Sequence, residues 1–72
     1  MPHVVIHVAA GRTPDEKSDL TRALTDALGR SLGSAEDHVS VEIIDEADWP
    51  QFYRAQIGPK LDTLNKRPGY SF

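Results

Sequence analysis

Apolar and polar residues alternate along residues 2–9, which read PHVVIHVA. On an extended backbone Val4, Ile6 and Val8 point to one side, and the residues between them point to the other. Alternation of this kind predicts a β-strand with one covered face. Gly11 follows the run and ends the predicted strand.

The apolar spacing then changes to that of a helix over residues 14–32. Thr13 is placed to cap this helix, Pro14 suits its first position, and Glu16 completes a capping box. Gly33 marks its expected end. The apolar positions form one stripe, made of Leu20, Ala23, Leu24, Ala27, Leu28 and Leu32. We therefore expect an amphipathic helix that covers one face of a sheet.

A second alternating run, residues 38–45, reads HVSVEIID and predicts a second strand. Its two faces carry Val39, Val41 and Ile43 on one side, and His38, Ser40, Glu42 and Ile44 on the other. A strand, a long helix and a second strand in this order usually form a β-α-β unit, with parallel strands and a right-handed crossover. The expected fold class is therefore α/β.

The last third of the chain is predicted to add a helical segment to this unit. Residues 48–51, DWPQ, predict a helix start with Asp48 as its cap. Gly58 and Pro59 predict a break or kink further on. The apolar residues of this region are Trp49, Phe52, Ile57, Leu61 and Leu64.

The length of 72 residues fits a single domain over residues 1–72. A chain this short buries only about 60% of the surface that its unfolded form exposes. Two parallel strands and one helix also leave one face of the sheet uncovered, which is not a stable arrangement. We therefore expect a homo-oligomer, in which another copy extends the sheet or covers its free face.

Composition and charge narrow the class of protein. The net charge is −3, and the Lys and Arg residues are scattered, which argues against a nucleic-acid partner. No apolar run approaches the ~20 residues of a membrane span, and no signal segment is visible, so we expect a cytoplasmic protein without a membrane partner. The absence of cysteine excludes a disulfide framework and a thiolate nucleophile.

Most kinds of site chemistry find little support in the sequence. His3 and His7 lie four residues apart on one strand face, about 13 Å, which is too far for one metal ion. The serines carry no nucleophile-elbow signature, and Gly11 stands alone, without a phosphate-loop or dinucleotide fingerprint. No metal and no cofactor are therefore expected.

Pro2 is the remaining candidate for chemistry. If Met1 is removed, Pro2 carries a free secondary amine at the chain terminus, where an ordinary α-amino group titrates at about 7.7–8.0. A neighbouring cation and an apolar setting lower the pKa of such an amine, so that it can act as a general base. The alternative stays open that Pro2 only begins a strand, where its missing N–H matters least.

The order and spacing of several segments carry a resemblance to a known family. MP before the first strand, GR after it, RSLG at the helix end and HVSVEII in the second strand resemble the 4-oxalocrotonate tautomerase family over residues 2–46. The later segments IGPKLDTL and KRPGYSF are similar to a longer bacterial subgroup of these tautomerases. The resemblance implies a homodimer rather than the hexamer of shorter members, with a four-stranded sheet completed by dimerisation.

The same resemblance implies roles for individual residues. Pro2 matches the catalytic base, and Arg12 matches an arginine that binds a substrate carboxylate through two hydrogen bonds. Ser40 stands where family members that act on dicarboxylates have a second arginine, which favours monoacid substrates. Trp49 or Phe52 is implied as the apolar wall of the pocket, although both fit equally well in a core.

The implied function is that of a cofactor-independent tautomerase, an isomerase acting on a small carboxylate such as a 2-hydroxydienoate or an arylpyruvate enol. Two alternatives stay open. One is a hydratase or dehalogenase of the same superfamily, in which a protonated Pro2 acts as an acid. The other is a non-catalytic oligomeric module that keeps the fold.

Overall fold

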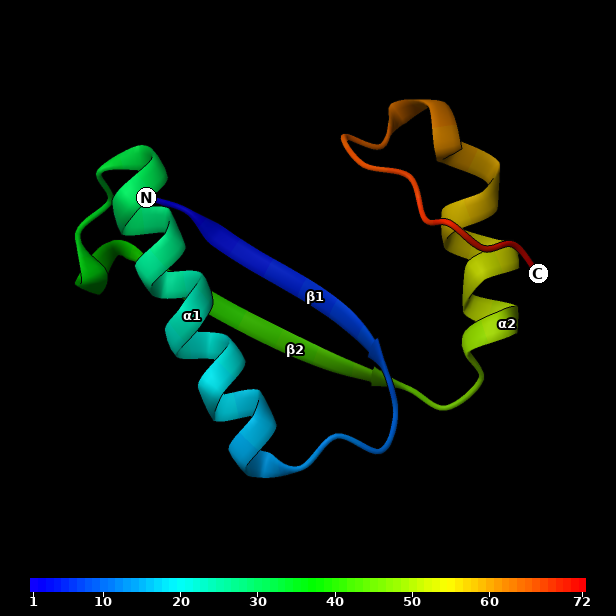
Figure 1. Cartoon of the computed structure of the whole chain (residues 1–72), viewed down its shortest axis with the longest axis horizontal. Helices are drawn as coiled ribbons and strands as arrows, with labels where there is room; N and C mark the ends of the chain where they lie inside the picture. The colour runs from blue at the N-terminus through cyan, green and yellow to red at the C-terminus, as the bar shows by residue number, and fades with distance from the viewer.

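The computed structural model describes all residues from Met1 to Phe72. Its first part consists of β1 (His3–Ala9), α1 (Pro14–Leu32) and β2 (Ser40–Glu46), which Figure 1 shows in blue to green. The two strands are parallel neighbours in a two-stranded sheet, and they are paired along their whole length, from first residue to last. The predicted β-α-β unit is confirmed.

Local signals set both ends of α1. At its start, the Thr13 hydroxyl accepts the Glu16 N–H at 3.1 Å, and the Glu16 carboxylate accepts the Thr13 N–H at 2.9 Å. At its end, Gly33 has φ 68°, a left-handed conformation that glycine adopts without steric cost, and its N–H donates to the Gly29 carbonyl. The helix therefore begins and ends where the sequence predicts. Its apolar stripe stops short, however, because Leu32 remains 66% exposed.

The second strand begins two residues later than predicted, at Ser40. Residues Glu36–His38 form a short 3-10 turn, η1, in place of extended backbone. The turn is held because the His38 N–H donates to the Ala35 carbonyl at 3.0 Å, and the Val39 N–H donates to the Glu36 carbonyl at 3.1 Å. These hydrogen bonds place His38 outside the strand, so it does not share the face of Ser40 as the alternating pattern predicted.

The C-terminal segment is helical but irregular. It consists of α2 (Trp49–Phe52), a π-helical turn η2 (Tyr53–Ile57) and a 3-10 stretch η3 (Gly58–Thr63). The Asp48 carboxylate accepts the Gln51 N–H at 3.2 Å, which confirms the predicted helix start.

The predicted break in this segment is present, but the change of helix type comes earlier. The ladder widens to π-type bonding at Tyr53, where the Gly58 N–H donates to the Tyr53 carbonyl. Pro59 has no N–H to continue this ladder. The non-helical backbone then falls on Lys60, with φ −132° and ψ 31°.

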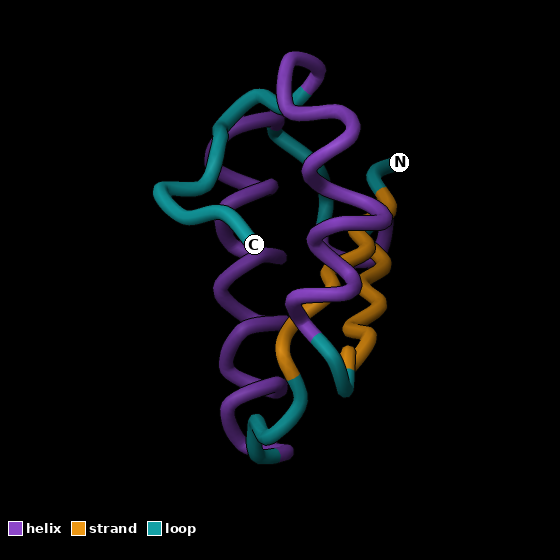
Figure 2. Tube along the Cα trace, turned by 90° about the vertical axis from the view of Figure 1, so that its right-hand side faces the viewer, coloured by secondary structure: helices purple, strands orange, loops and turns teal.

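The strands lie between α1 and the C-terminal segment (Figure 1), and in the turned view the two helical parts remain separate arms (Figure 2). On one face of the sheet, Val8 and Leu20 of α1 line a common hollow. On the other face, the Phe52 ring stacks on the His7 ring. Because His7 and Val8 are consecutive strand residues, their side chains point to opposite faces, so α1 and α2 approach the sheet from opposite sides.

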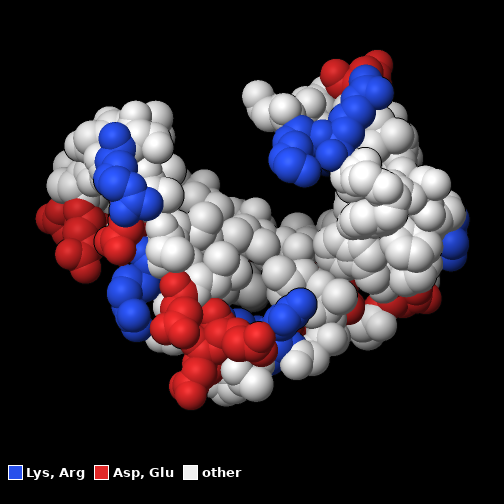
Figure 3. All heavy atoms as spheres, in the orientation of Figure 1, with Lys and Arg blue, Asp and Glu red and all other residues white.

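The chain buries little of its surface. Only Tyr53 is buried, at 5% exposure. The accessible surface is 5395 Å², whereas a compact monomer of this size exposes about 4,500 Å². The Cα radius of gyration is 13.9 Å, against about 11 Å for a compact chain of this length. Figure 3 shows the reason for this large surface and radius: a hollow lined by residues other than Lys, Arg, Asp and Glu opens over the strands, between α1 and the C-terminal segment.

The outer edge of β1 is unpaired within the chain. At the two ends of the ladder, the Ser40 N–H donates to the Pro2 carbonyl and the Ala10 N–H donates to the Glu46 carbonyl. Even-numbered residues of β1 therefore turn their backbone groups toward β2, and odd-numbered residues turn them away. The residues that present free backbone groups at this edge are His3, Val5, His7 and Ala9. No helix of the structure has both the length and the apolar character needed to cross a membrane.

Candidate active site

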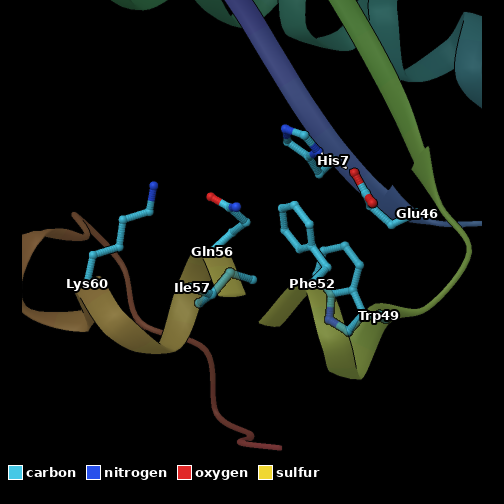
Figure 4. A pocket seen from close by; sticks show the side chains of 7 residues that line it. All are labelled: His7, Glu46, Trp49, Phe52, Gln56, Ile57 and Lys60. Atoms are coloured by element: carbon cyan, nitrogen blue, oxygen red, sulfur yellow. Dashed lines mark hydrogen bonds and ion pairs between the residues drawn. The ribbon is translucent and has the colours of Figure 1, made fainter. Parts of the chain in front are cut away.

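A cavity of ≈ 660 Å³ lies at the carboxyl ends of the strands, beside the C-terminal segment (Figure 4). The sheet contributes two polar residues to it, and the helical segment contributes an apolar wall and two further polar side chains. The lining residues are His7, Glu46, Trp49, Phe52, Gln56, Ile57 and Lys60. A mixed lining of aromatic surface and few polar groups is typical of small-molecule sites.

The two strands and α2 fix the position of His7. Its Nδ1 lies 2.7 Å from Glu46 Oε2, a pairing that follows from the parallel alignment of β1 with β2. The Phe52 ring stacks on the imidazole with centroids 4.7 Å apart, and Trp49 packs on Phe52 at 5.1 Å. The result is an aromatic stack that continues from the sheet into the helical segment and forms one wall of the cavity.

A second hollow, of ≈ 470 Å³, adjoins the first along the end of β1. It is lined by residues 7–12 and Trp49, so that His7 and Trp49 border both spaces. Gly11, with φ 117°, makes the turn that leads the chain out of the strand here. Arg12 comes directly after this turn and therefore lies next to the aromatic wall.

Arg12 is held in place by the capping box of α1. Its Nη1 donates to Glu16 Oε2 at 3.2 Å, while 64% of the Arg12 side chain remains exposed. The Thr13 N–H and then the Arg12 guanidinium stabilise the Glu16 carboxylate, which lowers its pKa. A guanidinium has five N–H donors, so most of them remain available to a ligand carboxylate.

Pro2 and Ser40 lie at the other end of the sheet. The Pro2 carbonyl accepts the Ser40 N–H at 3.2 Å, and Ser40 Oγ lies 2.6 Å from His3 Nδ1. Along a strand, the eight steps from Pro2 to Ala10 span about 26 Å. A single chain therefore brings Pro2 together with Ser40, and Arg12 together with Trp49, but it keeps these two groups apart.

The amino terminus is open to processing. Met1 is 94% exposed, whereas Pro2 is only half-buried. Removal of Met1 therefore breaks little packing. With Met1 attached, the Pro2 nitrogen is an amide and carries no proton-accepting lone pair.

Gln56 and Lys60 line the cavity but were not identified from the sequence. Gln56 follows Phe52 at a helical interval of four, but Lys60 lies beyond the predicted break at Gly58 and Pro59, so no regular spacing marked it. Tyr70 was also missed: its hydroxyl accepts the Trp49 indole N–H at 2.9 Å. No local signal could reveal that contact, because 21 residues separate the two positions.

Comparisons with known proteins identify the family of the chain. The family model described as "Tautomerase enzyme" matches residues 2–55. A protein named Tautomerase PptA from Enterobacter sp. (strain 638) is 39% identical over 75 residues, which covers 99% of both chains. Proteins of the same name from Pectobacterium carotovorum and Escherichia coli (strain SMS-3-5) are 37% and 31% identical, and each alignment covers at least 99% of both chains. The chain belongs to the tautomerase family of isomerases.

Proposed function

We propose that this enzyme catalyses keto–enol proton transfer on a small carboxylate, with the free imino nitrogen of Pro2 as its base. The substrate class is a 2-hydroxydienoate or an arylpyruvate enol. The observation that carries this proposal is the aromatic-walled cavity bordered by Trp49 and Phe52, which adjoins a hollow containing Arg12. A planar conjugated acid fits such a space, with its flat body on the rings and its carboxylate on the guanidinium.

A homodimer joins the two separated halves of this site. The free edge of β1 can pair antiparallel with the same edge of a second copy. Pairing about Val5 sets Pro2 of one copy opposite Val8 of the other, and Val8 lines the hollow that contains Arg12. Each site then receives its base from one copy, and its carboxylate anchor and aromatic wall from the other.

The surface area supports such a dimer. Each protomer exposes 5395 Å², which is about 900 Å² more than a compact monomer. A standard protein interface buries about 800 Å² per partner. The pairing also extends the two-stranded sheet to four strands, which removes the exposed edge of β1.

The chemistry requires only side chains and the chain terminus. Neutral Pro2 takes the proton from the enol hydroxyl, and the enolate forms while Arg12 holds the adjacent carboxylate. The resulting prolinium returns the proton to carbon, which gives the keto acid and regenerates the neutral amine. In the proposed dimer the Pro2 amine of one copy lies beside the guanidinium and the aromatic wall of the other.

The test is ketonisation of phenylenolpyruvate, followed by ultraviolet absorbance with protein whose intact mass shows that Met1 has been removed. We expect Pro2→Ala to lower kcat/KM by about 100-fold or more, because general-base catalysis contributes this much. Protein that retains Met1 serves as the control with an unchanged side chain, and it should be equally impaired. Equal rates for the processed wild type and both altered forms would overturn the assignment of Pro2.

A further inference from the structure

We propose that Lys60, assisted by the Gln56 amide, forms a second anion-binding subsite at the far end of the cavity. This inference rests on the proposed function, because it concerns the end of the substrate remote from the carboxylate that Arg12 holds. The family resemblance places a second cation at the position of Ser40. In this chain the positive charge comes instead from the C-terminal segment.

The helical segment presents both side chains to the cavity. Lys60 and Gln56 line it together with Phe52, and Figure 4 shows their head groups projecting to the same side, across from His7. Gln56 lies in the π-helical turn and Lys60 at the kink of the 3-10 stretch, so the change of helix type, and not a regular spacing, brings both side chains to the cavity beside Phe52. The subsite thus lies opposite the strand wall, with the aromatic rings between it and β2.

The charges of the cavity favour an anion at this point. Glu46 is its only carboxylate, and that group is paired with His7 at 2.7 Å. Lys60 takes part in none of the four ion pairs of the chain. Figure 3 shows Lys and Arg atoms on the inner side of the C-terminal arm, bordering the hollow. An ammonium with three donors and no acidic partner is suited to bind a carboxylate.

The subsite changes the expected specificity. Loss of the second arginine at Ser40 favours monoacids, whereas a cation at Lys60 restores a preference for substrates with a second acidic group. The preferred class then becomes a 2-hydroxydienoate or arylpyruvate enol that carries a carboxylate at its distal end. The two cationic positions, Arg12 and Lys60, border adjoining spaces that share His7 and Trp49.

Binding can be measured without turnover, because Trp49 is the only tryptophan and lines the cavity. Quenching of its fluorescence is titrated with benzoate and with benzene-1,4-dicarboxylate in the processed wild-type protein. We expect the dicarboxylate to bind about 10-fold more tightly, since a charge-assisted hydrogen bond contributes this much. Lys60→Gln should reduce the preference to about 2-fold or less, and Lys60→Arg should retain it.

Lys66→Gln is the matched control, because Lys66 is exposed and does not line the cavity. It should keep the preference for the dicarboxylate, and added salt should weaken that preference in the wild type. Equal binding of the two acids by the wild type, or an unchanged preference in Lys60→Gln, would overturn the subsite. If Lys60→Gln loses the preference but phenylenolpyruvate is not ketonised, the subsite stands and only the catalytic proposal fails.

Discussion

The β-α-β unit and the C-terminal segment of this enzyme differ in regularity, in burial and in what they contribute to the cavity. Regular elements build the first, yet none of its residues is buried in the isolated chain. The second passes through three helix types in fifteen residues, yet it holds the one buried side chain, Tyr53. It also supplies most of the cavity lining. The regular β-α-β unit therefore serves as the scaffold, and the irregular C-terminal segment gives the cavity its shape.

The aromatic residues show the same contrast. Tyr53, Tyr70 and Phe72 pack against one another with ring centroids 5.3–5.7 Å apart. Trp49 and Phe52 extend from this region to His7 on the sheet. The C-terminal segment therefore has an aromatic cluster of its own around the buried Tyr53, whereas the β-α-β unit holds no buried residue.

The largest effect is expected from a substitution at the free edge of β1, which tests whether the β-α-β unit pairs with a second copy. Val5→Pro removes an N–H that has no partner within the chain, so it leaves the β1–β2 ladder intact but blocks antiparallel pairing with another copy. We expect the dissociation constant of the dimer to rise by about 100-fold, and ketonisation to be lost. Sedimentation velocity at micromolar concentration measures this effect.

Val41→Pro is the matched control for that experiment. Val41 lies in β2 with its backbone groups on the outer edge, away from β1. It introduces the same backbone restraint into the other strand, and it should leave the dimer intact. A monomeric wild type, or equal dissociation of both variants, would contradict the pairing of β1 edges.

A smaller effect is expected where the C-terminal tail contacts the wall of the cavity. Tyr70→Phe keeps the ring in contact with Tyr53 and Phe72 but removes the hydroxyl that accepts the Trp49 indole N–H. Loss of one hydrogen bond of this kind costs about 1 kcal/mol. We expect KM to rise by about 5-fold with kcat little changed, together with a shift in the Trp49 emission.

Phe72→Leu provides the comparison for Tyr70. Phe72 contacts the rings of Tyr53 and Tyr70 but makes no hydrogen bond to Trp49. It should lower the melting temperature while leaving KM and the Trp49 emission near their wild-type values. If both variants change KM equally, the hydroxyl has no specific role in positioning Trp49.

The smallest effect is expected at Glu16, on the scaffold side. The Thr13 N–H and the Arg12 guanidinium lower the pKa of its carboxyl, so its ionised form stabilises the folded chain. A carboxyl with a depressed pKa contributes stability at pH values above its unfolded pKa, and that contribution is lost as the pH falls through the folded pKa. Thermal melts should show Glu16→Gln below the wild type at pH 7, with the difference vanishing under acid conditions.

Asp19→Gln is a suitable control, because Asp19 is an exposed acid on the same helix, 3.5 Å from Arg22, and lies outside the capping box. It should change the melting temperature little at either pH. A difference between Glu16→Gln and the wild type that persists at low pH would show that the packing of Glu16 matters more than its charge.

Local chemistry explains which parts of the fold the sequence predicted. Thr13, Glu16 and Gly33 act on their own neighbours, so α1 was predicted to the residue. His38 was placed wrongly because the alternating pattern extended across a turn whose hydrogen bonds are invisible to that pattern. Where a strand and a turn compete for the same residues, the periodicity of apolar positions alone does not decide which one forms.

The site was less accessible to prediction than the fold. The sequence indicated Trp49 and Phe52 without deciding between wall and core, and the structure places both at the cavity. It did not indicate Lys60, since a change from π to 3-10 geometry and a kink determine where that side chain points. The separation of Pro2 from Arg12 depends on the whole length of a strand, which no short motif expresses.

The near absence of buried side chains, taken with the proposed homodimer, ties the survival of this protein to its abundance. A chain with Tyr53 as its sole buried residue has little to resist unfolding by itself, so in that dimer folding and association become one equilibrium. Dilution then acts as a denaturant, and newly made chains remain open to proteases until they meet one another. The level of expression thereby sets both how much enzyme exists and how long each molecule lasts.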